Sequence, residues 1–221
     1  MLKLAIFDIC GTLYHDNTTY SFLRWLSDKG IIKYNKSIMD APYILRALNM
    51  IYSSVLGQDI YRSLQIKQLS NLSFDDINKW AIEFVDDLEE NRIFSTNALM
   101  DEYKNAGYKI VIASATIDPV AKAIANKFDV DYFSSVIDFS NNICTGKLKK
   151  DLLFLKKNVL LHLINNAENT VVVTDNYTDI ELVQISDCCH IVVRNERDIK
   201  KWNKCLKENI QKVNYIKKNT L

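Results

Sequence analysis

The sequence predicts an α/β fold: a Rossmann-like parallel sheet flanked by helices, with an inserted all-helical cap domain. Short apolar, strand-like runs alternate with helical patterns over residues 95–221, and this alternation is typical of a parallel sheet. Between the first strand and this alternation, the pattern is helical throughout. We therefore expect a core domain of residues 1–14 plus 95–221, and a cap domain of residues 15–94.

The composition narrows the class of protein. The chain has 221 residues, enough for a core and an insert, and its formal net charge of +1 gives no argument for a nucleic-acid partner. No window supplies the roughly 20 uninterrupted apolar residues of a membrane span, and the opening run is too short for a secretory signal. Five cysteines without CxxC spacing favour reduced thiols and a cytoplasmic location. Nothing in the pattern indicates an oligomeric state.

The first strand and the helical block have clear local signals. The apolar run LKLAIFDI (2–9) predicts a buried strand. Two threonines can cap a helix over 20–29, and a longer helix is expected over 37–57. Ser73 begins a capping pattern for a helix over 74–90, in which apolar residues recur at helical spacing.

The second half of the chain predicts the rest of the sheet. We expect strands at 108–115, 130–139, 170–175 and 190–195, and helices at 95–105, from 118, at 149–166, at 178–186 and around Trp202. The Lys-rich end is interpreted as a solvated, fraying helix rather than a nucleic-acid patch; its lysines are Lys207, Lys212, Lys217 and Lys218.

Polar residues stand at three of the predicted strand ends. Asp8 follows LAIF, Ser114 follows KIVIA, and Asp175 follows VVVT, with Asp179 four residues later. Each one alone is more often a helix cap or a turn residue. In a parallel sheet, however, the carboxyl ends of the strands share one edge, where ligands bind. Together the residues indicate a site at that edge.

These residues carry a family resemblance. FDICGTLY is similar to the first motif of the haloacid dehalogenase superfamily, VIASAT to the second, and TDNYTD to the fourth. Each motif is weak alone, but the three occur in order on predicted strand ends and run over nearly the whole chain. The helical insert resembles a type I cap, and SAT with CTGKL resembles the phosphoserine-phosphatase-like branch.

The resemblance implies a Mg²⁺-dependent phosphatase that acts through an aspartyl-phosphate on Asp8. A covalent intermediate divides one difficult displacement into two easier ones. Carboxylates with water and phosphate oxygens suit Mg²⁺. The implied metal site consists of Asp8, Asp175 and the main-chain carbonyl of Cys10, with Asp179 holding a metal-bound water or orienting a neighbour.

The resemblance also implies phosphate ligands and a lysine. The hydroxyl of Ser114 and the following amide, of Ala115, are expected to hold a phosphate oxygen, and the lysine balances the charge on phosphorylated Asp8. Lys157 fits the expected place best, with Lys156 as the alternative. The neighbouring candidates are Lys147, Lys149 and Lys150. Most of these lysines are expected on a solvated helix face.

One position departs from the pattern. Phosphatases of this superfamily usually carry a second Asp two residues after the nucleophile as the general acid and base, and here that position is Cys10. Such groups contribute roughly 10²–10⁴-fold to the rate. Three explanations compete: a leaving group that needs little protonation, another proton donor such as His15 or Asp16 on the following loop, or a chain that binds a phosphorylated ligand without hydrolysing it well.

The expected substrate is a small phosphorylated metabolite. Phosphoserine itself is disfavoured, because the glutamate that holds its amino group in that branch is replaced here by Asn17. The alternative function is a catalytically weakened phosphate-ligand-binding or protein-interaction domain.

Overall fold

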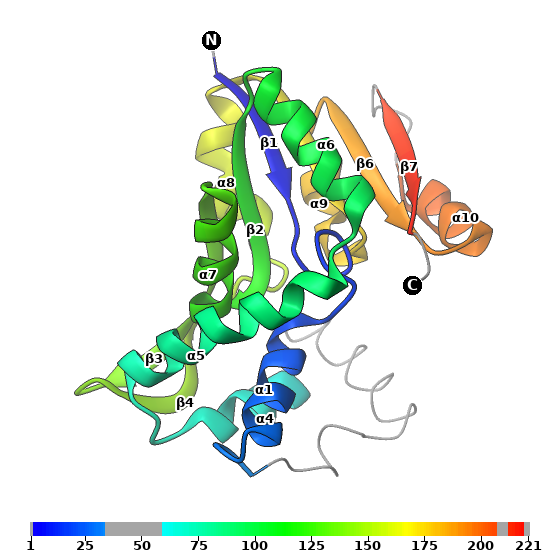
Figure 1. Ribbon diagram of the computed structural model, residues 1–221. Coiled ribbons are helices and arrows are strands. Elements are labelled where there is room, and N and C mark those ends of the chain that lie inside the picture. The colour runs from blue at the N-terminus through cyan, green and yellow to red at the C-terminus, as the bar shows by residue number, and fades with distance from the viewer. Residues whose placement is uncertain (1, 34–58, 207–211, 219–221) are drawn as a thin grey trace.

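The structure is a computed structural model, and it describes residues 2–33, 59–206 and 212–218 (Figure 1). The strands are β1 (Leu2–Phe7), β2 (Lys109–Ile117), β3 (Asp131–Ser140), β4 (Ile143–Lys150), β5 (Ala167–Thr174), β6 (Cys188–Val193) and β7 (Val213–Lys217). The α-helices are α1 (Thr18–Asp28), α4 (Ile60–Ile66), α5 (Phe74–Asp87), α6 (Phe94–Asn105), α7 (Asp118–Phe128), α8 (Lys156–Asn165), α9 (Ile180–Val183) and α10 (Glu196–Cys205). Short 3₁₀ turns are η1 (Lys67–Leu69), η2 (Leu88–Asn91) and η3 (Tyr177–Asp179).

The strands form one sheet of seven, in the order β4-β3-β2-β1-β5-β6-β7. Every neighbouring pair is parallel except β3 with β4. Strand β1 lies between β2 and β5, so the carboxyl ends of these three strands lie at one edge. The predicted parallel α/β fold and the helical region after the first strand are confirmed.

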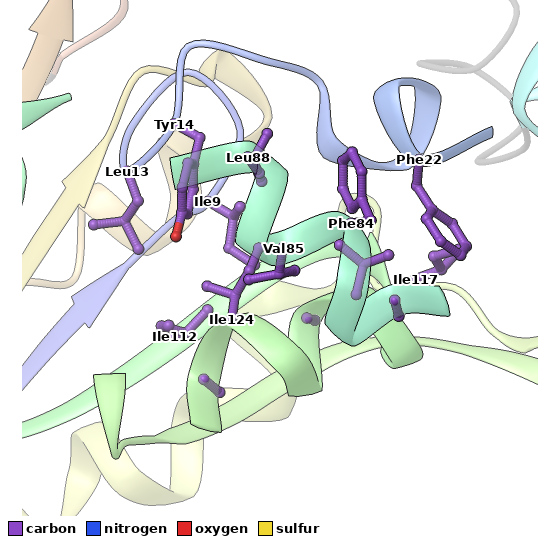
Figure 2. Close-up of a cluster of buried hydrophobic side chains, with 14 of the residues drawn as sticks. Ile9, Leu13, Tyr14, Phe22, Phe84, Val85, Leu88, Ile112, Ile117 and Ile124 are labelled. Carbon is purple, nitrogen blue, oxygen red and sulfur yellow. The ribbon is translucent and has the colours of Figure 1, made fainter. Parts of the chain in front are cut away.

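The sheet buries a cluster of side chains on each face. Along β1, Ala5 and Phe7 belong to one cluster and Leu4 and Ile6 to the other, as the alternation of side chains along a strand requires. The larger cluster joins the helical insert to the sheet, and Figure 2 shows Phe84 of α5 among its members. Its labelled residues are Ile9, Leu13, Tyr14, Phe22, Phe84, Val85, Leu88, Ile112, Ile117 and Ile124.

Helix starts in the insert follow the expected capping chemistry, with one shift. Ser73 caps α5, and its hydroxyl accepts the main-chain N–H of Asp76 at 3.1 Å, as predicted. Helix α1 is capped by the side chain of Asn17, and the two threonines predicted as caps are its buried first residues. The predicted helix over 37–57 lies outside the described residues.

The helix predicted for 149–166 is wrong in its first part. Residues up to 150 belong to β4, which pairs antiparallel with β3, and α8 begins only at Lys156. The hairpin turns at Asn141 and Asn142, both with positive φ (49° and 66°), as a tight two-residue turn requires. The main-chain N–H of Cys144 donates to the carbonyl of Leu72 at 2.8 Å, which links the hairpin to the insert.

The Lys-rich end is also different from the prediction. Residues 213–217 form β7, which pairs in parallel with β6, instead of a fraying helix. Lys217 lies in this edge strand, where charged side chains discourage further pairing, and Lys212 and Lys218 flank it. Lys207 lies outside the described residues. Across the described part of the chain, no helix combines the length and apolar character needed to cross a membrane.

Candidate active site

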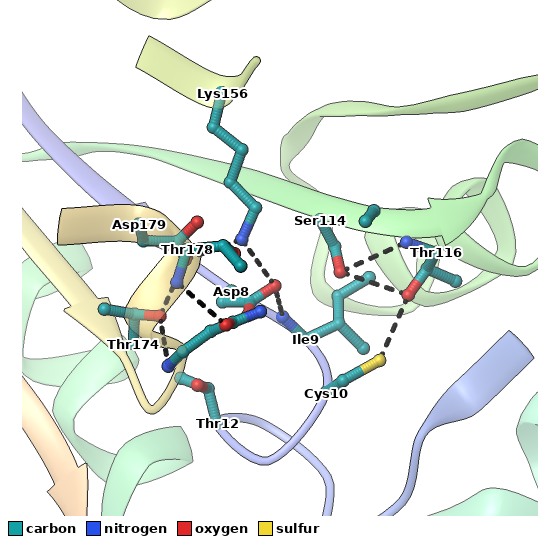
Figure 3. A network of polar contacts seen from close by, with 12 residues as sticks. Asp8, Ile9, Cys10, Thr12, Ser114, Thr116, Lys156, Thr174, Thr178 and Asp179 are labelled. Atoms are coloured by element: carbon teal, nitrogen blue, oxygen red, sulfur yellow. Dashed lines mark hydrogen bonds and ion pairs between the residues drawn. The ribbon is translucent and has the colours of Figure 1, made fainter. Parts of the chain in front are cut away.

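Asp8 stands directly after β1 at the carboxyl edge of the sheet. Its main-chain N–H donates to the carbonyl of Val173 in β5 at 3.0 Å, which fixes the strand end. The side chain is buried, with 4% exposed. Its Oδ1 accepts the N–H of Ile9 at 2.8 Å and lies 3.0 Å from Lys156 Nζ (Figure 3). Among the described residues, no hydrogen bond is made to Oδ2, so this oxygen is available to a ligand.

The lysine that reaches Asp8 is Lys156, and the structure does not bring Lys157 to the site. Lys156 Nζ also contacts Asp179 Oδ2 at 2.7 Å, and the side chain is buried. Lys157 is 35% exposed and lies 3.4 Å from Glu181. Helical periodicity explains the difference, because Lys156 shares the inward face of α8 with the buried Leu160.

Two carboxylates stabilise the positive charge of Lys156 in this cluster. Burial alone would lower the pKa of Lys156, but the carboxylates of Asp179 and Asp8 outweigh it and raise the pKa. Asp179 Oδ2 also accepts the hydroxyl of Thr174 at 2.7 Å. Asp179 therefore orients the lysine, which was one of its two expected roles.

Asp175 approaches the loop after β1 so closely that only glycine fits there. A Cβ on Gly11 would lie 1.9 Å from Asp175 Oδ2, and Gly11 has a φ of +71°. The main-chain N–H of Asp175 donates to Thr12 Oγ1 at 3.0 Å. Burial, followed by the charge of Asp8, raises the pKa of Asp175 to about 7. The loop thus holds a second carboxyl group near the first.

This donor set fits a magnesium ion. The charge of Asp8 disfavours the charged form of Asp175, and a cation shared between the two carboxylates would remove that cost. The described residues make no hydrogen bond or ion pair to the Asp175 carboxylate, and they contain no group of three His, Cys, Asp or Glu side chains placed to hold a metal. Two carboxylates, the main-chain carbonyl of Cys10 and water molecules are the oxygen ligands that would hold such an ion.

Cys10 lies in a chain of hydroxyl groups. Its Sγ is 3.2 Å from Thr18 Oγ1 and 3.4 Å from Thr116 Oγ1, and these two hydroxyls are 2.8 Å apart. Ser114 Oγ continues the chain, 3.1 Å from Thr116 Oγ1. Burial, with the nearby charge of Asp8, raises the pKa of the Cys10 thiol. The thiol therefore stays protonated and neutral.

A cavity of about 110 Å³ opens beside Asp8. Cys10, Ser114 and Ala115 line it, as the expected phosphate site requires, and Asn17 lines it from the insert. His15 and Asp16 are not among the described residues that line this cavity. The carboxylate of Asp16 accepts Asn91 Nδ2 at 2.8 Å, while burial and Lys218 lower the pKa of His15.

Arg62 of α4 also lines the cavity, and the sequence analysis missed it. The side chain is buried, and its guanidinium donates to Asp151 Oδ1 at 2.5 Å, to Ser135 Oγ at 2.9 Å and to the carbonyl of Ala115. An arginine in a helical pattern is typical of a solvated surface. Its three partners come from β2, from β3 and from the residue after β4, and only the tertiary fold brings them together. Arg62 thus joins the insert to the cavity beside Asp8.

Comparisons with known proteins agree with the resemblance of the sequence motifs. The model of the haloacid dehalogenase-like hydrolase family matches residues 5–184. No curated protein matches the chain.

Several solved structures share the fold. A protein of unknown function from Bordetella pertussis Tohama I has a TM-score of 0.73 at 16% identity, covering 97% of this chain and 98% of that one. A phosphoserine phosphatase described as a phospho-aspartyl intermediate analogue has a TM-score of 0.61 at 17% identity, covering 96% and 93%. A cytosolic 5'-nucleotidase IIIB bound to cytidine has a TM-score of 0.64 at 11% identity, covering 99% and 81%. At these identities the likeness establishes the fold alone.

Proposed function

We propose that this chain, which belongs to the haloacid dehalogenase-like hydrolase family, is a Mg²⁺-dependent phosphatase that acts on a small phosphorylated metabolite through Asp8. The observation that carries the proposal is the contact of Lys156 with Asp8 and Asp179 at the edge of the sheet, beside the cavity. Burying a lysine with two carboxylates carries a desolvation cost, and charge clusters of this kind in a cavity are typical of functional sites.

The geometry supports Asp8 as the nucleophile. Oδ1 of Asp8 is held by Ile9 and Lys156, which leaves Oδ2 to attack phosphorus. Lys156 remains beside the carboxyl group to balance the charge of an aspartyl-phosphate. Mg²⁺, held by Asp8, Asp175 and the carbonyl of Cys10, would supply the positive charge that lets two anions approach each other.

The cavity walls support phosphate binding. Ser114 Oγ and the main-chain amide of Ala115 are proposed to hold a phosphate oxygen, as in the sequence-based expectation. Arg62 lines the same cavity from α4, and its guanidinium, paired with Asp151, holds the carbonyl of Ala115 in the cavity wall. We also propose that residues 15–94 form a cap over the site, with Arg62 as its contact to the phosphate pocket.

The second candidate is a phosphate-ligand-binding domain with weak hydrolysis. The observation that favours it is the thiol of Cys10 in the place of a carboxylate, tied to Thr18 and Thr116. A chain of this kind would bind phosphorylated ligands but release little phosphate.

A panel of phosphate esters, assayed with and without Mg²⁺, separates the two candidates. The enzyme reading predicts Mg²⁺-dependent release of phosphate that Asp8→Asn abolishes. Equal rates in the unsubstituted chain and in Asp8→Asn would rule out catalysis by Asp8. Binding of phosphate without turnover in the unsubstituted chain would favour the binding domain.

A further inference from the structure

We infer that a phosphoryl group persists once it is on Asp8, and that the chain takes it from donors whose leaving group departs as a stable anion, such as acyl or aryl phosphates. This rests on the proposed function, because it presupposes phosphorylation of Asp8. Two observations carry it: the set of side chains around the cavity, and the way in which Cys10 is held among them.

The cavity offers few groups that could move a proton. Besides Asp8, its described lining supplies hydroxyls, amides, one guanidinium, one thiol and a single further carboxylate, that of Asp59. No histidine is among the described lining residues. Alcohol hydroxyls and amides do not exchange protons readily at neutral pH, and a guanidinium does not give up its proton. The candidates for proton transfer are therefore Cys10, Asp59 and, as an acid, the phenol of Tyr20.

The sulfur of Cys10 makes its hydrogen bonds with other groups of the protein. Its sulfur lies beside the hydroxyls of Thr18 and Thr116 and accepts the main-chain N–H of Thr18 at 3.4 Å. These contacts tie the loop after β1 to the start of α1 and the end of β2. The thiol therefore connects these three segments of the chain. A carboxylate in the same place could instead protonate a leaving group or activate a water molecule.

Asp59 is engaged in capping α4. Its Oδ1 accepts the main-chain N–H of Arg62 at 2.9 Å. This hydrogen bond holds the carboxylate at the start of α4. A variant of Asp59 tests whether this carboxylate takes part in proton transfer.

Transfer from an acyl phosphate balances without a proton. A carboxylate oxygen of Asp8 forms a bond to phosphorus while the bridging P–O bond of the donor breaks, and the electron pair leaves on the carboxylate of the donor. An alkyl phosphate would instead release an alkoxide that needs a proton, and hydrolysis of the product needs a base for the attacking water. General acids and bases accelerate such steps by roughly 10²–10⁴-fold.

The test uses the full chain with Mg²⁺ and three donors: acetyl phosphate, 4-nitrophenyl phosphate and glycerol phosphate. After an acid quench, intact-protein mass spectrometry measures the gain of one phosphoryl group, and hydroxylamine should remove it if the linkage is an acyl phosphate. We expect a labelled protein that stays labelled after the donor is removed. The first two donors should react faster than the alkyl ester by roughly 10²-fold or more.

A matched pair of variants examines position 10. In Cys10→Asp, the three groups that surround the sulfur can donate to the new carboxylate. We expect this variant to shorten the lifetime of the phosphorylated protein by roughly 10²–10⁴-fold. Cys10→Asn has the same shape without the basic oxygen and should leave the lifetime long.

The test distinguishes failure of this inference from failure of the proposed function. If Asp8-dependent turnover of glycerol phosphate is as fast as that of acetyl phosphate and no labelled protein accumulates, the inference is wrong while the proposed function stands. In that case, label accumulation in Asp59→Asn would assign the acid–base role to Asp59. If no donor gives labelling or turnover that Asp8→Asn abolishes, the inference and the proposed function both fail.

Discussion

Two adjacent lysines at the start of α8 have different surroundings. Lys156 contacts Asp8 and Asp179 in a buried cluster, whereas Lys157 lies partly exposed beside Glu181. We expect Lys156→Met to lower phosphate release by roughly 10²-fold or more, because the charge on the reacting Asp8 loses its partner.

Lys157→Met is the matched control. Its ion pair is exposed, and such pairs contribute about 0–1 kcal/mol to the free energy of unfolding. Phosphate release should therefore be unchanged in this variant. A larger loss in Lys157→Met than in Lys156→Met would contradict the assignment.

Alanine variants at Gly11 and Gly30 separate the effect of backbone strain from the effect of steric crowding. Both have positive φ, but a Cβ on Gly11 would collide with Asp175, while a Cβ on Gly30 has nothing within 4 Å. Either alanine variant should lose about 1–2 kcal/mol of stability through backbone strain. Only Gly11→Ala should also weaken Mg²⁺ binding in calorimetry, and equal Mg²⁺ affinity in the two variants would refute the role of the close approach.

The raised pKa of Asp175 predicts that metal binding depends on pH. Its pKa in the metal-free protein is raised to about 7 by burial and by Asp8, above the ordinary value of 3.8. A raised carboxyl pKa means that the folded state holds the proton more tightly, so ionisation of Asp175 costs stability as pH rises from 3.8 toward 7. Bound Mg²⁺ displaces this proton.

Calorimetry in buffers of different ionisation enthalpy checks this expectation. Mg²⁺ affinity should rise with pH up to about 7 and then level off, with proton release below that pH. Asp175→Asn should bind weakly at every pH. Affinity that does not change with pH in the unsubstituted protein would contradict a shared carboxylate site.

At the scale of elements, the charged side chain of Arg62 and the buried Ile66 join α4 to the core. Arg62 donates to Asp151, which precedes α8, and to Ser135 in β3. A double-mutant cycle with Arg62→Met and Asp151→Asn should give a coupling of about 1–3 kcal/mol in urea unfolding, because each single change leaves a polar partner unpaired. Additive effects would show that the contact adds nothing to stability.

How much of each element could be predicted depends on where its signal lies. The apolar runs of β1, β2, β5 and β6 carry their own signal, and so does the capping pattern at Ser73. Strand β4 is rich in lysine because it lies at the edge of the sheet, and β7 lies at the other edge. Such strands resemble solvated segments in sequence, since only one side of their backbone is paired.

The residues of the site also differ in whether the sequence carries a local signal for them. Asp8, Ser114 and Asp175 follow buried strands and could be found from the sequence. The choice between Lys156 and Lys157 depends on the phase of α8, which a boundary error of a few residues obscures. Arg62 reaches the cavity through the packing of α4 against β4, which no local pattern records.

For the molecule as a whole, the helical insert and the sheet share a core. Phe22 and Phe84 of the insert belong to the same buried cluster as Ile112 of β2 and Ile124 of α7 (Figure 2). We expect a single cooperative unfolding transition, because neither part keeps its buried surface without the other. Tryptophan fluorescence and far-UV circular dichroism should give coincident urea curves. Two separate transitions would show that the insert folds independently.

The central claim is that Asp8 and Asp175 share a divalent cation beside the lysine-bound nucleophile. Anomalous diffraction from crystals grown with Mn²⁺, which accepts the same oxygen ligands as Mg²⁺, tests it most directly. The account predicts one strong peak in contact with both carboxylates, absent in Asp175→Asn. A cation bound elsewhere, or the two carboxylates turned away from each other with no peak between them, would contradict it.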